Sequence, residues 1–402
     1  MKLLFMNMHS YGSIDVPVAF SRITAPDGSA IEVIDRPFEN TEKRRDPEFE
    51  ETFFSELQRE QPDAVFSFNY YPLISTVCRK AELPYISVTY DSPLIALYSA
   101  TVINPCNHVY VFDSSVAEEF RRNRILTVKY LPLATGVQRL DAMRPGAKEH
   151  ARYDADVAFV GGLYTEKHTF YDRMEPQLDD YTRGYLEGLM NAQLKVDGVN
   201  FIEQCLTPRV IEGMTKAYDI PPHADGVETR AWIYSEYVIN RKITQTERSA
   251  RLKDIGARFG ETHRIAMYTR DEDASFPGVE NRGRIDYYDT MPYAFKCAKI
   301  NLNFTLRSIH RGIPLRAFDI MGCGGFLLTN YQSDFFELFE PGVDFVYYES
   351  NEDLLDKIAY YLSHDEEREA IAKNGHDKVA AEHTWEVRLS QILWDVFGEK
   401  VD

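Results

Sequence analysis

A short loop of the sequence carries two arginines and a histidine immediately before a predicted helix. These are Arg307, His310 and Arg311, and the loop continues through Gly312 and Ile313. A diphosphate placed at the start of that helix would meet unpaired backbone N–H groups, the positive end of the helix dipole and two guanidinium groups. The loop therefore predicts an anion site, with a plain surface loop before a capped helix as the alternative interpretation.

The helix after this loop is predicted over 314–322, because Pro314 suits a first helical turn. We include Arg316, in that first turn, among the residues expected to bind the anion. One turn further, Asp319 would point from the same helix, and a carboxylate there can accept hydrogen bonds from both hydroxyls of a ribose.

Two wound halves are predicted to position these residues. Short apolar runs alternate with longer amphipathic stretches, a pattern typical of parallel sheets with crossover helices. In the first half, strands are expected at 2–6, 31–35, 64–68, 85–89, 108–112 and 127–131. In the second half, they are expected at 156–160, 264–268, 299–304, 325–329 and 343–348.

The domain boundaries follow from the same pattern. We predict an N-terminal Rossmann-like domain over 1–145, with the aperiodic stretch 142–153 as a linker. A second Rossmann-like domain is predicted over 154–383, and it contains a helical insertion at about 172–258. The segment 384–402 is expected to be a C-terminal helix that braces the N-terminal domain.

Composition excludes several other classes of protein. The 402 residues carry a net charge of −18, which argues against a nucleic-acid surface as the main partner. No apolar run approaches the ~18 residues that a membrane span requires, and the N-terminus lacks the apolar region of a signal peptide. The 5 cysteines have no CxxC spacing, so a reducing cytoplasm is the expected location.

The outline of two Rossmann-like halves is shared by dehydrogenases, binding proteins and GT-B glycosyltransferases, so architecture alone does not choose among them. The segment KINLNFTLRSIHRGIPLRAFDIMGCGGFLLTNY (299–331) and the tail from 346 to 389 are more specific. Together with DVAFVGGLYTEKHTFY, FSFNYYPLIS, SVTYDSP and YLPLA, they make the sequence resemble the CgeB-type (spore maturation protein-like) family of GT-B glycosyltransferases, a branch of glycosyl transferases group 1.

The resemblance implies a GT-B fold, in which two Rossmann-like domains face each other across a cleft. It implies transfer of a sugar from a nucleotide-diphosphate-sugar donor, bound mainly by the C-terminal domain, to an acceptor hydroxyl. Asp319 matches the acidic residue that holds the donor ribose, which is usually Glu in related enzymes. Eight residues earlier, retaining relatives carry a Glu that contacts the transferred sugar, whereas this sequence has Arg311.

The same resemblance assigns further donor contacts. Gly161 and Gly162 match the glycine turn where the family's backbone approaches the diphosphate, although a plain strand-to-helix turn remains the alternative. Lys167 is a nearby candidate for phosphate charge, and Arg270 would sit at the same sheet edge.

Ile285 and Tyr287 are expected to contact the nucleotide base. The family places the base against the segment 283–292, which contains both residues. Tyr287 and Tyr288 could equally be core residues.

No metal or resident cofactor is predicted. Asp154 and Asp156 have the spacing of a metal-binding DxD motif, but they directly precede a strand in an architecture where that motif has no such role. Chance matches are also common in a chain with 63 acidic residues. The nucleotide-sugar is then a substrate, with a UDP-sugar as the first expectation.

An inverting enzyme also needs a base to take the proton of the acceptor hydroxyl. Asp91, after the strand 85–89, is the favoured candidate, and His9, after the first strand, is the other. Gly12, Asn69 and Tyr90 are expected to shape the acceptor side.

The acceptor is left open between a protein, a cell-surface or spore polymer and a small molecule. Two alternative functions keep the same fold: a GT-B-type nucleotide-sugar epimerase, and a non-catalytic nucleotide-binding or assembly protein.

Overall fold

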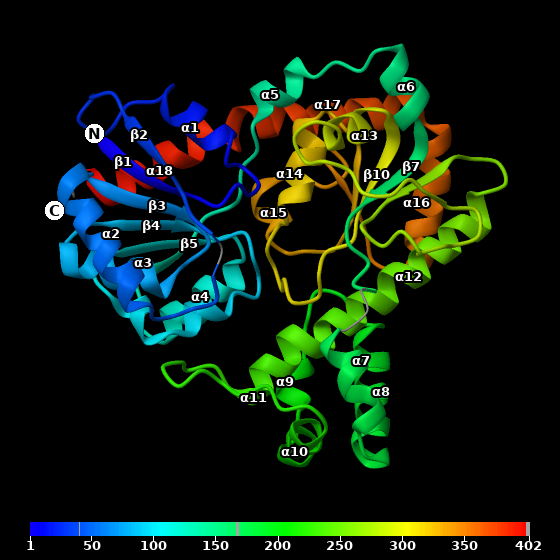
Figure 1. Cartoon of the computed structure of the whole chain (residues 1–402). Coiled ribbons are helices and arrows are strands. Elements are labelled where there is room, and N and C mark those ends of the chain that lie inside the picture. The colour runs from blue at the N-terminus through cyan, green and yellow to red at the C-terminus, as the bar shows by residue number, and fades with distance from the viewer. Residues whose placement is uncertain (40, 166–168, 399–402) are drawn as a thin grey trace. The chain divides into compact units, whose positions relative to one another are not determined.

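The computed structural model describes residues 1–39, 41–165 and 169–398. The chain divides into two compact units, each built on its own parallel sheet (Figure 1). Unit 1 comprises Met1–Gly136, His223–Glu228 and Ala381–Asp402, and unit 2 comprises Val137–Pro222 and Thr229–Ala380.

The sheet of unit 1 has six parallel strands in the order β2-β1-β3-β4-β5-β6. The strands are β1 (Lys2–Asn7), β2 (Glu32–Pro37), β3 (Ala64–Phe68), β4 (Tyr85–Val88), β5 (Asn107–Val111) and β6 (Val128–Tyr130). β3 and β4 are buried along their whole length, as expected for strands covered by helices on both faces. All six strands predicted in this half are confirmed to within two residues.

Helices flank this sheet, and two of them begin at a side-chain cap, Asp46 or Asp113. The flanking helices are α1 (Asp15–Phe20), α2 (Pro47–Glu60), α3 (Pro72–Ala81), the 3-10 turns η1 (Ile95–Tyr98) and η2 (Ala100–Ile103), and α4 (Ser114–Arg122). The C-terminal helix α18 (Trp385–Phe397) also belongs to this unit and packs on α1 (Figure 1). The Trp385 side chain is buried there, with its ring edge toward Phe68.

The sheet of unit 2 also has six parallel strands, in the order β12-β11-β10-β7-β8-β9. They are β7 (Ala155–Val160), β8 (Ile265–Tyr268), β9 (Glu280–Asn281), β10 (Ala298–Asn303), β11 (Leu327–Asn330) and β12 (Val346–Tyr348). This is the strand order of the dinucleotide-binding Rossmann fold. The sequence predicted five of these strands and missed β9, which is too short to give an apolar pattern.

Other helices surround this sheet, and three of them contact its strand β10. The surrounding helices are α13 (Met291–Lys296), α14 (Leu315–Gly322), α15 (Phe335–Leu338), α16 (Asn351–Ser363) and α17 (Asp365–Glu382). α16 contacts both β10 and β12, and its Leu354 and Ile358 enter the core of the unit. The helix begins at Ser350, whose side chain accepts a hydrogen bond from the Asp353 N–H over 3.1 Å.

A helical insertion lies between β7 and β8 (Figure 1). It contains α7 (Phe170–Met174), η3 (Glu175–Gln177), α8 (Asp180–Gln193), α9 (Ile202–Cys205), α10 (Pro208–Ala217), α11 (Arg230–Ile233), the π-helical turn η4 (Tyr234–Ile239) and α12 (Asn240–Phe259). It has an apolar core of its own. The far end of α12, however, places Leu252, Ile255 and Phe259 in the core of the sheet, so the insertion and the sheet share one long helix.

The predicted linker over 142–153 is wrong in its structure. Unit 1 ends at Gly136, and the following residues form α5 (Val137–Ala142) and α6 (Ala147–Tyr153). The Glu149 carboxylate accepts a hydrogen bond from the Gly146 N–H over 2.9 Å, which supplies a cap to a short polar helix with no apolar periodicity. Within residues 1–39, 41–165 and 169–398, no helix combines the length and apolarity needed to cross a membrane.

Ser350→Ala should lower the free energy of unfolding of unit 2 by about 1 kcal/mol, because the first turn of α16 loses its side-chain cap. The measurement is urea denaturation followed by circular dichroism. Ser350→Asp keeps an acceptor at this position and is the matched control. Equal losses for both variants would contradict the assignment of Ser350 as the cap.

Candidate functional site

The strand order of unit 2 reverses between β7 and β10, which are neighbours in the sheet although far apart in sequence. In open parallel sheets, ligands bind outside the carboxyl ends of the strands at such a reversal. The first residue after β7 is Gly161, and the first residue after β10 is Phe304. Any ligand of unit 2 is therefore expected beside these two residues.

Arg316 reaches this point from the first turn of α14. Its Nη1 donates to the Asn303 Oδ1 over 3.2 Å, at the end of β10. Its guanidinium carbon lies 5.9 Å from the centre of the Phe159 ring, on β7. Arg316, which the sequence predicted to bind an anion, therefore lies at the strand reversal.

Asn303 fixes the direction of this arginine. Its amide nitrogen donates to the Thr305 hydroxyl over 3.0 Å and to the Thr329 hydroxyl over 2.9 Å, and its side chain is buried. With both amide hydrogens used, the amide oxygen is left to accept from Arg316. Sequence reasoning did not single out Asn303, although a polar residue at the end of an apolar strand was a signal for it.

The two glycines after β7 play different parts. A Cβ on Gly161 would lie 2.8 Å from the Arg316 Nη2, so a side chain there would displace the guanidinium. A Cβ on Gly162 would have no atom within 4 Å among the described residues. None of the described residues between β7 and α7 is helical, so no helix begins directly at this turn. Close approach of Arg316 explains the first glycine, and packing does not explain the second.

The residues predicted to bind ribose and base are in contact with each other. The Tyr287 hydroxyl donates to the Asp319 Oδ1 over 3.1 Å, and Asp319 is only 3% exposed. Arg139 covers both tyrosines of this segment, with its guanidinium carbon 5.9 Å from the Tyr287 ring and 5.1 Å from the Tyr288 ring. Ile285 is half-buried nearby in sequence. Their roles toward a nucleotide stay predictions.

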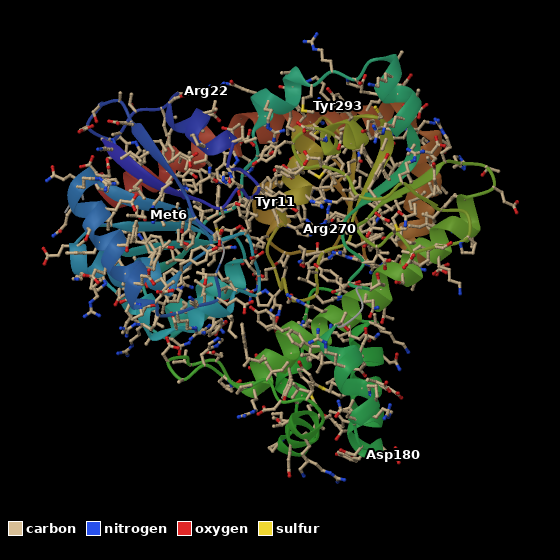
Figure 2. All side chains as sticks on the ribbon, in the orientation of Figure 1. Met6, Tyr11, Arg22, Asp180, Arg270 and Tyr293 are labelled. Atoms are coloured by element: carbon tan, nitrogen blue, oxygen red, sulfur yellow. The ribbon has the colours of Figure 1, made fainter. Side chains whose placement is uncertain are left out.

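Arg270 lies beyond the end of β8, next to β7 in the sheet, and is labelled in Figure 2. Its side chain is exposed and has no hydrogen-bond or ion-pair partner within the described part of the chain. It is an available cation on the carboxyl edge of the sheet. Lys167, the other predicted phosphate contact, lies outside the described residues.

Arg307 corrects one of the predictions. Its guanidinium donates to both oxygens of Glu247, over 2.9 and 2.6 Å, pairs with Asp197 over 2.7 Å, and donates to the Val196 carbonyl. These bonds join the loop after β10 to the insertion. They occupy the groups that a phosphate would need, so Arg307 is a structural residue.

The remaining loop residues differ in exposure. Arg311 is exposed, while His310 is partly buried with its Nε2 3.4 Å from the Glu236 carboxylate. Gly312 is buried, and Ile313 is 2% exposed. The Ile313 side chain therefore packs in the interior, and the predicted contact of this residue with the donor stays a prediction.

In unit 1, the strand order reverses between β1 and β3. Asn69 follows β3, and its amide oxygen accepts from the Tyr90 N–H over 2.9 Å and the Asp91 N–H over 3.2 Å. Its amide nitrogen donates to the Asp91 carboxylate over 2.8 Å. The loop after β4 is thereby locked to the end of β3, with the Asp91 carboxylate held in one orientation and exposed.

His9 and Gly12 follow β1 on the same edge of that sheet. His9 is exposed and has a φ of 53°, and its N–H donates to the Asn7 side chain over 2.8 Å. Gly12 has a φ of 82°, and a Cβ there would lie 2.4 Å from the Tyr90 hydroxyl. Asn69 is also in the left-handed region, with a φ of 55°. Left-handed non-glycine residues outside helix ends often mark functional loops.

Asp154 and Asp156 do not act as a pair. Asp156 accepts from the Arg264 N–H over 2.8 Å and pairs with Lys299 over 3.0 Å, whereas Asp154 contacts His150 over 2.8 Å. Each carboxylate has its own partners at the start of β7.

Sequence reasoning missed Arg248, on α12 of the insertion. It is 3% exposed, and its guanidinium donates to the carbonyls of Gly162 and Phe304. Its only signal in the sequence was position: Arg248 is four residues before Leu252, on the buried face of α12.

Comparisons with known proteins agree with this architecture. Residues 243–394 match the model of a family described as glycosyl transferase-like. A search of curated proteins finds no match.

Several solved structures are similar along nearly the whole chain. A glycosyltransferase from Rickettsia africae ESF-5 has a TM-score of 0.53 at 9% identity, covering 100% of this chain and 99% of that one. Sucrose-phosphate synthase from Thermosynechococcus elongatus has a TM-score of 0.53 at 12% identity, covering 99% of each chain. The N-terminal domain of trehalose-6-phosphate phosphatase from Candida albicans has a TM-score of 0.55 at 11% identity, covering 100% and 97%. The chain has the GT-B fold, and the predicted α/β fold class with two Rossmann-like domains is confirmed.

Gly161→Ala should weaken the binding of inorganic pyrophosphate by at least about tenfold, because the new methyl group displaces the Arg316 guanidinium. The fold should persist, since a flexible side chain can move aside. Isothermal titration calorimetry measures the affinity. Gly162→Ala, with open space at its Cβ, is the matched control and should bind as the wild type does. Equal affinity for pyrophosphate in the two variants would contradict a role of Arg316 in binding it.

Glu247→Gln should lower the free energy of unfolding at neutral pH by about 3 kcal/mol, because it removes a buried carboxylate from between arginines. Burial alone would raise the pKa of Glu247, but Arg251 and Arg307 outweigh burial and lower that pKa from its ordinary value of 4.5.

The stabilisation by Glu247 is therefore present above about pH 4.5 and is lost as the pH falls through the lower folded-state pKa. Urea denaturation between pH 7 and pH 3 should show a shallower loss of stability in Glu247→Gln than in the wild type. The exposed Glu352→Gln is the control. Parallel curves for Glu247→Gln and the wild type would contradict the shift.

Proposed function

We propose that this chain is a glycosyltransferase that moves a sugar from a nucleotide-diphosphate-sugar donor to an acceptor hydroxyl. One observation carries the proposal: Arg316 meets Gly161 and Asn303 at the strand reversal of unit 2, one turn of α14 before the Asp319–Tyr287 pair. The match of residues 243–394 to a glycosyl transferase-like family supports it.

The order of groups along α14 fits the order of groups in a nucleoside diphosphate. Arg316 and Asp319 are three residues apart, so they share one face of the helix. A diphosphate beside Arg316 and the helix N-terminus would put the ribose one turn along, beside Asp319. Tyr287 would then lie next to the base and ribose. A UDP-sugar is the proposed donor.

The proposed reaction is independent of metal. As the bond to the sugar breaks, negative charge develops on the departing diphosphate, and preorganised donors in a water-poor site stabilise such charge strongly. Arg316 and the positive end of the α14 dipole would supply that stabilisation, and Arg270 adds a further cation on the same sheet edge.

Asp91 is the proposed base for the acceptor hydroxyl, with His9 as the second candidate. The amide of Asn69 holds one carboxylate oxygen of Asp91 in place, and the side chain is exposed, as a base that meets an acceptor must be. The acceptor is a protein, a cell-surface or spore polymer, or a small molecule.

We place the chain in the CgeB-type branch of GT-B enzymes and in the cytoplasm. The segment 299–331 supports the branch, since it carries the loop, the helix start and the acid in the family's order. The scattered cysteines, which are free in the structure, support a reducing compartment.

UDP should bind to the wild type in the presence of EDTA, and Asp319→Asn should weaken that binding by about 10- to 100-fold, because a hydrogen bond to a charged group is lost. Calorimetry with UDP, GDP, dTDP and CMP identifies the base. Asp273→Asn, an exposed acid on the same unit, is the control and should bind as the wild type does. A folded wild type that binds none of the four nucleotides would overturn the proposal.

Asp91→Asn should leave UDP affinity unchanged and lower turnover by about 10²- to 10⁴-fold, because only proton removal is lost. Turnover is measured as free UDP together with glycosylated acceptor. An isomeric donor formed without acceptor would instead establish an epimerase, and binding without any turnover would establish a nucleotide-binding protein.

A further inference from the structure

Arg248 joins the two loops that leave the strand reversal of unit 2. Its Nη1 donates to the Gly162 carbonyl, after β7, and its Nη2 donates to the Phe304 carbonyl, after β10. The side chain comes from α12, so the helical insertion supplies a bond between two loops of the sheet. One planar guanidinium can hold two acceptors in this way because its N–H groups form a rigid fork.

The same arginine lies close to the proposed diphosphate site. Its guanidinium carbon is 5.7 Å from the centre of the Phe159 ring, and that of Arg316 is 5.9 Å from the same ring. Arg248 also stacks on Tyr164, at 5.0 Å, which has a φ of 59° in the loop after β7. The guanidinium groups of Arg248, from α12, and of Arg316, from α14, thus both lie close to Phe159 on β7.

Arg248 is a buried cation with no carboxylate of its own. Among the described residues it makes no ion pair, and its Nε has no hydrogen-bond partner. The neighbouring Glu247 is bonded to Arg251 and Arg307, and Arg307 also holds Asp197. Three guanidinium groups face two carboxylates, which leaves one positive charge in this buried cluster.

This arrangement costs stability in the unliganded protein. Burial lowers the pKa of Arg248, which shows that the surroundings oppose its charge. An unpaired buried ion is unfavourable even after its surroundings relax. An anion bound at the strand reversal would supply the missing negative charge.

The backbone next to Arg248 offers a donor for such an anion. A trans peptide holds its C=O and N–H in opposite directions, so the Leu163 N–H is directed away from Arg248 when the Gly162 carbonyl accepts from it. This N–H has no acceptor within the described residues. A bound oxyanion beside the glycine turn would satisfy it.

We infer that Arg248 is a positioning residue for the donor diphosphate: it ties the Gly161–Gly162 turn to the loop after β10, and its buried charge completes the anion site. The inference rests on the proposed function, because it assumes that the anion is the diphosphate of a nucleotide. Arg248 acts through the two loops and through its field, without touching the nucleoside.

The experiment measures the binding of UDP, inorganic pyrophosphate and uridine by calorimetry to Arg248→Met, Arg248→Lys and the wild type. Arg258→Met is the matched control, because Arg258 is on the same helix, is exposed and pairs with Asp356 at the surface. Arg248→Met should weaken UDP and pyrophosphate by at least about tenfold and leave uridine unchanged. Arg248→Lys keeps the charge and should lose less, and Arg258→Met should bind all three as the wild type does.

A thermal-shift measurement adds a readout that a purely structural role would not move. Pyrophosphate pairs the buried charge in the wild type, so it should raise the Tm of the wild type more than that of Arg248→Met at equal concentration. If Arg248→Met does not fold, Arg248→Lys carries the test, with a loss of UDP affinity expected relative to Arg258→Lys.

The outcomes distinguish a failure of the proposed function from a failure of the role inferred for Arg248. A folded wild type that binds no nucleotide overturns the proposed function and this inference together. Wild-type binding of UDP with unchanged pyrophosphate affinity in folded Arg248→Met overturns this inference alone. Equal losses of pyrophosphate and uridine would show that Arg248 only maintains the fold of the loops, which also overturns it.

Discussion

Parallel strand pairing is the constraint on which the candidate site depends. All strands of a parallel sheet end on the same edge, so a reversal of strand order leaves two neighbouring loops that diverge and expose the backbone between them. In unit 2 this happens between β7 and β10, and in unit 1 between β1 and β3. Several residues predicted from sequence to do chemistry, among them Gly161, Arg270 and Asp91, lie in the loops at these edges.

The buried charges of unit 2 follow from the same geometry. The loops at the reversal have few backbone partners of their own, so side chains must hold them. Arg307 holds the β10 loop through Glu247 and Asp197, and Arg248 holds the carbonyls of both loops. Arg248 is on the long helix α12, and Arg307 bonds to Glu247 on the same helix, so the insertion holds both loops of the site in place.

Most of the fold could be predicted because its signals are local. The strands are short apolar runs, and the helix over 314–322 is marked by Pro314, which precedes Leu315 in the structure. The prediction of an aperiodic linker over 142–153 failed because its helix α6 depends on a single cap from Glu149 and not on periodicity. The prediction that Arg307 binds phosphate failed for a different reason. A guanidinium fits a phosphate or a carboxylate equally well, and only the fold shows that Glu247 and Asp197 are its neighbours. For Arg248 the sequence gives only its position relative to Leu252, because its partners are backbone carbonyls in loops that are far apart in the chain.

Buried cations beneath the loops offset the repulsion that a net negative charge exerts on an anionic ligand. With a net charge of −18, the surface as a whole repels an anionic ligand, and exposed arginines would be screened by salt and by nearby acids. A guanidinium in the interior is screened much less, so Arg248 adds attraction at the strand reversal without attracting anions elsewhere. Arg316, half-buried and aligned by Asn303, extends the same principle to the surface of the site. Arg248 and Arg316 thereby place two positive charges at the strand reversal of unit 2.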